Sequence, residues 1–105
     1  MLFHVTARHD VDQCGMYHEE IRQALQAYLP LIPSRCEEYG VKIHFAVAGH
    51  PEHVFYFLVE ADDVSAVCTL LCEVPMKQTF DIRPVRSLAF ELTPSHPEPQ
   101  TPASV

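Results

Sequence analysis

The chain has 105 residues and a formal net charge of −7, since 14 acidic residues outnumber seven lysines and arginines. This length predicts one domain, small enough for dimerisation to help it bury apolar surface. The acidic excess argues against nucleic acid and anionic membranes as partners, because both bind through clustered cations.

The start of the sequence lacks the features of an export signal. Residues 1–5 contain no basic region followed by an apolar run. No apolar stretch of the sequence approaches the roughly 20 residues that span a bilayer. We therefore expect a soluble cytoplasmic protein with free thiols rather than disulfides. The four cysteines are Cys14, Cys36, Cys68 and Cys72.

The first half of the chain predicts a strand followed by helical segments. Residues 1–8 alternate between two faces, as in a strand. Apolar residues recur at helical spacing over 17–28, and this helix should stop at Pro30. The sequence Ser34-Arg35-Cys36-Glu37 is typical of a capping box that opens a short last turn, which Gly40 would close.

The second half predicts two strands, a helix and a last strand. Alternation over 41–48 and 53–60 indicates strands joined by a turn at 49–52. Asp62 is the expected cap of the following helix, which Pro75 ends. The apolar stripe of that helix is Val64, Val67, Cys68, Leu71 and Cys72, so both cysteines are expected to be buried.

The remaining residues complete the predicted architecture. Residues 80–88 form the fourth strand, and the order βαββαβ is that of ferredoxin-like α+β domains. In that fold a four-stranded antiparallel sheet carries both helices on one face, and its bare face needs a partner sheet or a ligand. The domain spans residues 1–92. The proline-rich residues 93–105 predict a disordered tail.

The alternation of the strands assigns each side chain to a face. An uninterrupted apolar set is predicted to lie under the helices: Phe3, Val5, Ala7, Val41, Ile43, Phe45, Val47, Phe55, Phe57 and Val59. The bare face is predicted to carry Leu2, His4, Thr6, Arg8, Lys42, His44, Ala46, Ala48, Val54, Tyr56, Leu58 and Glu60. This second set is too polar for a plain dimer seam, because buried polar groups need partners. We expect a polar ligand or water cluster there.

Three stretches of the chain resemble a known family. They are His4-Val5-Thr6-Ala7-Arg8-His9, Gly40-Val41-Lys42-Ile43-His44-Phe45, and Pro51-Glu52-His53-Val54-Phe55-Tyr56 continuing to Glu60-Ala61-Asp62. With the βαββαβ plan, these stretches look like a small uncharacterised family of the dimeric α/β-barrel superfamily, over about residues 1–90. The resemblance implies a homodimer in which two sheets pack face to face around a cavity. The superfamily includes haem-binding and haem-degrading proteins, cofactor-free monooxygenases, muconolactone isomerases and small nickel-binding proteins.

The bare face carries one candidate metal site. With the usual strand order 4-1-3-2, His4 and His44 flank Glu60 on strands about 10 Å apart. Two inward-reaching imidazoles can share one metal ion, with Glu60 as third ligand and one position open. The alternative is that His4 and His44 only form hydrogen bonds across the dimer, to Glu60 or Tyr56.

The opposite edge of the sheet gathers a second group of candidate ligands. This group comprises His9, Asp10, Asp12, Cys14, His18, His50 and His53. Its histidines His9 and His53 are the candidate metal ligands, and Cys14 shares a helix face with His18 if the helix has begun by Cys14. Such ligands suit zinc, nickel or copper, but their spacing matches no established motif. Solvated loop histidines are the alternative.

Two functions therefore stay open. The first is a homodimer that binds a transition metal (nickel, zinc, copper or iron) or a haem iron through its histidines. The second is a cofactor-free enzyme of monooxygenase or isomerase type that acts on a small aromatic molecule in the barrel. In that enzyme His4 or His44 is the general base, Tyr56 donates a proton and Arg8 holds an anionic oxygen.

Overall fold

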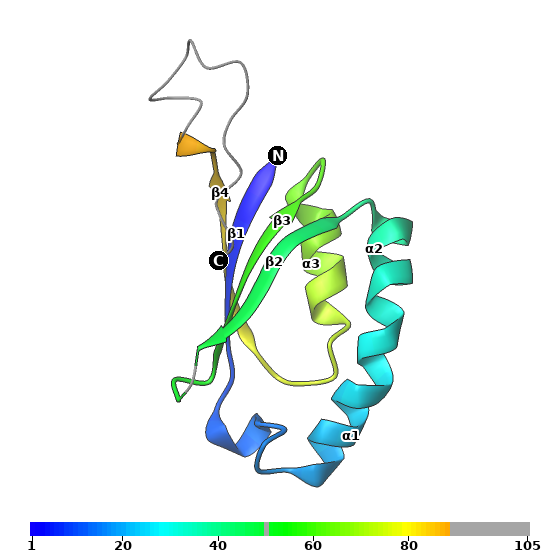
Figure 1. The fold of residues 1–105 in the computed structure, drawn as a ribbon, viewed down its shortest axis with the longest axis vertical. Coiled ribbons are helices and arrows are strands. Elements are labelled where there is room, and N and C mark those ends of the chain that lie inside the picture. Colours follow the sequence, from blue (N-terminus) through cyan, green and yellow to red (C-terminus); the bar gives the residue numbers. More distant parts are fainter. Residues whose placement is uncertain (50, 89–105) are drawn as a thin grey trace.

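The fold is an α+β arrangement of one sheet and one layer of helices. A computed structural model describes residues 1–49 and 51–88. Four antiparallel strands form a sheet in the order β2-β3-β1-β4, and the helices lie on one side of it (Figure 1). The predicted α+β class and antiparallel sheet are confirmed, and the arrangement is compatible with a ferredoxin-like fold. The predicted tail, residues 93–105, and His50 lie outside the described residues.

The elements occur close to where the sequence predicts them. The strands are β1 (Leu2–Arg8), β2 (Lys42–Gly49), β3 (Val54–Glu60) and β4 (Thr79–Val85). The α-helices are α1 (Glu19–Tyr28), α2 (Ile32–Tyr39) and α3 (Val64–Cys72), and the one-turn 3-10 helices are η1 (Val11–Gln13) and η2 (Leu29–Leu31). The last strand ends at Val85 rather than at residue 88 as predicted. Within the two described ranges, no helix has the length and apolar character needed to cross a membrane.

The chain stays helical beyond the proline that was expected to stop it. α1 ends at Tyr28, but η2 carries Pro30 in a new first turn, where a missing N–H is tolerated. The predicted capping box is wrong: Ser34 lies inside α2, and its hydroxyl donates to the Leu31 carbonyl at 2.9 Å. Gly40 does close α2, with a left-handed φ of 69°.

The core lies between the sheet and the α2–α3 pair. β1 alternates as predicted, since Phe3, Val5 and Ala7 are buried while their neighbours His4 and Thr6 are only half-buried. The buried cluster comprises Phe3, Val5, Val41, Val59, Ala61, Val67, Leu70 and Leu71. α1 contributes no buried residue. The main buried cluster therefore lies toward one end of the sheet, while Ala7, Cys14 and Val54 are buried at the other end.

A β-bulge in β2 changes the predicted faces of that strand. Ile43 pairs with Val59, but Phe45 rather than His44 pairs with Leu58. One extra residue in a strand moves every following side chain to the other face. The prediction is therefore wrong for four residues: Phe45 and Val47 lie on the bare face, and Ala46 and Ala48 lie on the helix side.

α3 also differs from its prediction in its buried side and its cap. Val67, Leu70 and Leu71 are its buried residues, whereas Cys68 and Cys72 are exposed rather than buried. The cap is not Asp62 but the next residue, because Asp63 Oδ1 accepts the backbone N–H groups of Ser65 at 2.8 Å and Ala66 at 3.2 Å. The Ser65 hydroxyl also donates to Asp63.

Removing this cap should destabilise the protein. The Ser65 hydroxyl, followed by the backbone N–H groups of Ala66 and Ser65, holds the pKa of Asp63 below its ordinary value. This stabilisation is therefore present above the unfolded carboxyl pKa of about 3.9 and is lost as the pH falls through the lowered value. We expect Asp63→Ala to lower the urea midpoint at pH 7, with a difference from wild type that shrinks in acid.

The neighbouring aspartate provides the control for this prediction. Asp62→Ala removes a carboxylate from the same loop but none of the cap bonds, so its urea midpoint should stay close to that of wild type. Equal midpoints for the two variants would show that Asp63 does not cap α3 in solution.

Candidate metal centre

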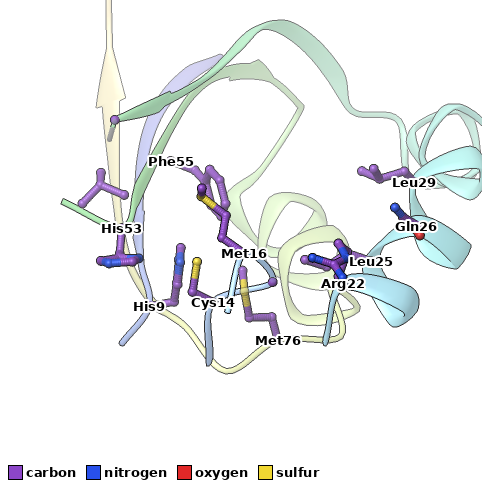
Figure 2. Close-up of a pocket in the computed structure, with 13 residues that line it drawn as sticks. His9, Cys14, Met16, Arg22, Leu25, Gln26, Leu29, His53, Phe55 and Met76 are labelled. Carbon is purple, nitrogen blue, oxygen red and sulfur yellow. The ribbon is translucent and has the colours of Figure 1, made fainter. Parts of the chain in front are cut away.

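Three side chains that can ligate a metal meet at the edge of the sheet where β1 ends and β3 begins. They are His9, just after β1, Cys14, just after η1, and His53, just before β3. One ligand atom from each lies within 4.8 Å of the others. Figure 2 shows the three side chains next to one another at one end of a cavity. The fold thus brings two imidazoles and a thiol together from three separate segments.

Backbone hydrogen bonds hold each of the three residues in place. The His9 N–H donates to the His53 carbonyl at 3.1 Å, which extends the β1–β3 pairing beyond the strands. His53 has a left-handed φ of 57°, which is uncommon for a residue with a side chain. The Cys14 carbonyl accepts the N–H groups of Tyr17 and His18, both at 3.1 Å. The loop after β1 is therefore tied to the start of α1 at the cysteine.

Neighbouring rings orient the two imidazoles. The His9 ring stacks on Phe55 at a centroid distance of 5.2 Å and meets the His53 ring edge-on at 5.3 Å. The Tyr17 ring also packs near His53, with the two ring centroids 6.0 Å apart. Such ring contacts favour defined relative orientations. The imidazoles are thus positioned by packing as well as by the backbone.

The Cys14 thiol is buried beside a cavity that is large enough to admit a further ligand. Cys14 is only 5% exposed and lines a cavity of about 430 Å³ together with His9, His53, Met16 and Met76. In tetrahedral zinc sites, bond lengths of about 2.0 Å to nitrogen and 2.3 Å to sulfur place neighbouring ligand atoms about 3.5 Å apart. Small side-chain rotations would therefore close the observed cluster onto one ion. The cavity leaves room for a fourth ligand.

The sequence predicted part of this centre. His9 and His53 are the two predicted ligands at this edge, and the structure brings them together. Cys14 was expected there only as one member of a wider group. It does not share a helix face with His18, since α1 begins at Glu19 and His18 is its N-cap. The alternation of β1 and β3 predicts that their ends are adjacent. The position of the thiol depends on η1, for which the sequence carries no periodic signal.

The second predicted set, on the bare face, is arranged differently. His44 Nε2 lies 2.8 Å from Glu60 Oε1, while the His4 ring packs against Tyr56 with centroids 6.2 Å apart. Across the part of one chain that the structure describes, the ligand atoms of His4, His44 and Glu60 do not converge as those of the edge cluster do. Arg8 is exposed at the other end of β1 from His4 and Glu60.

Two sequence comparisons find no relative of this protein. No protein-family model matches the chain, and a search of curated protein sequences finds no similar protein. Function is therefore inferred from the geometry of the residues.

The hydrogen bond between His44 and Glu60 should be visible in a titration. The pKa of the Glu60 carboxyl lies below its ordinary value, despite some desolvation. The hydrogen bond from His44 is the largest cause of the lowering, and the positive charges of His44 and Lys42 add to it. We expect His44→Ala to raise the pKa of Glu60 toward that ordinary value, as followed by carbon NMR of the carboxyl. Lys42→Ala removes only a nearby charge and should raise it less. An unchanged pKa in His44→Ala would contradict the hydrogen bond.

Proposed function

We propose that this protein binds a transition metal ion through His9, Cys14 and His53. The observation that supports the proposal is the convergence of three ligand atoms within 4.8 Å of one another. Imidazole and thiolate are the ligands that zinc and copper prefer in proteins. The thiol is 5% exposed, so an ion there would be held partly out of water, which strengthens its interaction with the thiolate.

The ligand set favours a bare ion over a haem iron. A haem leaves at most two axial positions for protein ligands, on opposite sides of the macrocycle. Here three donor atoms point to one small volume, which matches the three-ligand sites of zinc enzymes. All three residues line the cavity of about 430 Å³, which would leave room for a fourth ligand. A water or a small anion can complete the coordination there, so the site is of the open type.

The proposal includes a homodimer formed through the bare face of the sheet. That face carries the half-buried side chains of Leu2, Phe45, Leu58 and Tyr56, beside the more exposed Val47. A sheet with one apolar face and no covering layer gains stability by burying it against a second sheet. The metal centre lies at the sheet edge, so each chain of the dimer would hold its own ion.

Metal binding can be tested on protein purified without a histidine tag. We expect one zinc ion per chain by elemental analysis after dialysis. Cobalt should replace zinc and produce a thiolate-to-cobalt charge-transfer band, because Cys14 is a ligand. Cys14→Ser should abolish that band, and His9→Ala and His53→Ala should each weaken metal binding by at least about tenfold.

Matched variants separate this site from other cysteines and histidines. Cys68→Ser removes an exposed thiol of α3 and should leave both stoichiometry and the cobalt band unchanged. His4→Ala and His44→Ala test the ligands of the bare face in the same way. Loss of metal in those two variants alone, with full binding by Cys14→Ser, would overturn the proposed site.

The dimer can be tested by light scattering coupled to size-exclusion chromatography. We expect the wild-type protein to have twice the mass of one chain. Leu58→Asp places a charge in the centre of the bare face and should yield monomers, because a buried unpaired carboxylate is costly. Leu31→Asp, at a position that is 45% exposed on η2, is the control and should stay dimeric. A wild-type monomer would refute the homodimer and leave the metal site in each chain untouched.

A further inference from the structure

A cleft between α1 and the sheet forms a second site, which the metal proposal does not use. We name it the α1 cleft; it encloses about 360 Å³. α1 has no buried residue, and the buried cluster lies instead against α3. In Figure 1, α1 lies at the lower end of the helical layer and α2 rises toward its upper end. The space that α1 would fill by closing onto the sheet is open.

The walls of the α1 cleft are almost entirely apolar. They include Leu25 and Leu29 from the α1 side, Ala46 and Ala48 from β2, and Phe55 and Phe57 from β3. The bulge in β2 is what directs Ala46 and Ala48 to this side. Because alanine side chains are small, they leave a volume that larger residues at these positions would occupy. Leu29 remains 56% exposed, although it is a large apolar residue at the mouth of the cleft.

One buried polar atom lies in this apolar surface. Gln78 lines the α1 cleft, and its Oε1 is buried without a hydrogen-bond partner among the residues that the structure describes. Leaving a buried acceptor unsatisfied is unfavourable, and such atoms are rare in native proteins. The oxygen has almost no accessible surface as the side chain stands, so a ligand in the cleft that donates one hydrogen bond would satisfy it once the Gln78 amide rotates toward that ligand. Water alone would gain little here, because the remaining walls offer it few polar partners.

The size and walls of the cleft indicate the class of ligand. A dry cavity of about 150 Å³ holds a single benzene ring, so a volume of about 360 Å³ accepts two fused rings. Aromatic walls such as Phe55 and Phe57 favour an aromatic ligand over an acyl chain. We propose that the α1 cleft binds a small bicyclic aromatic molecule with one hydrogen-bond donor, which Gln78 Oε1 accepts.

Indole and indene are suitable probes for this site. The two molecules have nearly the same shape, but only indole carries an N–H donor. Titrations of the full-length chain can be followed by calorimetry and by nitrogen-resolved NMR. We expect both to bind in the cleft, indole more tightly, with shifts at the Gln78 side-chain amide and at the backbone of Leu25 and Phe55.

Variants of the lining separate the hydrogen bond from the apolar cavity. Gln78→Leu should lower the preference for indole over indene about tenfold, because the acceptor is gone while the cavity remains. Gln78→Met serves the same purpose if that variant folds poorly. Ala48→Leu, or Ala46→Leu, fills the cleft and should weaken both probes. Ala27 lies on α1 outside the cleft, so Ala27→Leu is the control and should bind both probes as wild type does.

Three outcomes would overturn the proposal. One is equal binding of indole by wild type and Ala48→Leu, and another is an unchanged preference for indole in Gln78→Leu. The third is a set of concentration-dependent shifts at Leu25 and Phe57 without any probe, which would show that a second copy of the chain fills the cleft. Cys14→Ser should bind indole as wild type does, so the cleft and the metal site can fail independently.

Discussion

The pairing of β1 with β3 is the constraint on which the other features depend. The two central strands pair over their full length, from Leu2 with Glu60 to Arg8 with Val54. The backbone bond from His9 to His53 continues the same ladder by one step. Because side chains alternate along paired strands, this register separates the core side from the bare face. It also places two imidazoles together at the edge of the sheet where β1 ends and β3 begins.

One end of the sheet carries the densely packed cluster, and the other end borders two cavities. At one end of the sheet, residues such as Val5, Val59 and Val67 are completely or almost completely buried and supply the apolar burial that folding requires. At the other end the apolar walls surround cavities, and the cavity beside the candidate metal centre and the α1 cleft share Leu25, Leu29, Phe55 and Met76. A site for a ligand needs unfilled volume, which lowers the packing contribution of that end. The dense core against α3 is therefore what allows α1 to stand away from the sheet.

The bulge at His44 shows how one extra residue in a strand changes which side chains lie on each face of the sheet. Without it, Phe45 and Val47 would fill the space under the helices, and the alanines would face outward. With it, the bare face gains apolar side chains suited to a partner sheet, and the helix side gains two small residues that leave the α1 cleft open. His44 itself lies close to Glu60. Periodicity alone cannot locate such an insertion, because the residues of one assumed face alternate with those of the other over 41–48 without any interruption in the sequence.

Periodicity by itself determined the four strands, the presence of helices between them and the buried side of β1, since local patterns of apolar residues reflect which face is buried. It also predicted that His9 and His53 share one edge, because antiparallel neighbours bring the end of one strand beside the start of the other. Tertiary structure alone decided the position of Cys14, the cap at Asp63 and the exposure of Cys68. The position of Cys14 depends on a turn, and the exposure of Cys68 depends on the rotation of its helix against groups distant in the sequence. The cap depends on a choice between two adjacent aspartates of equal propensity.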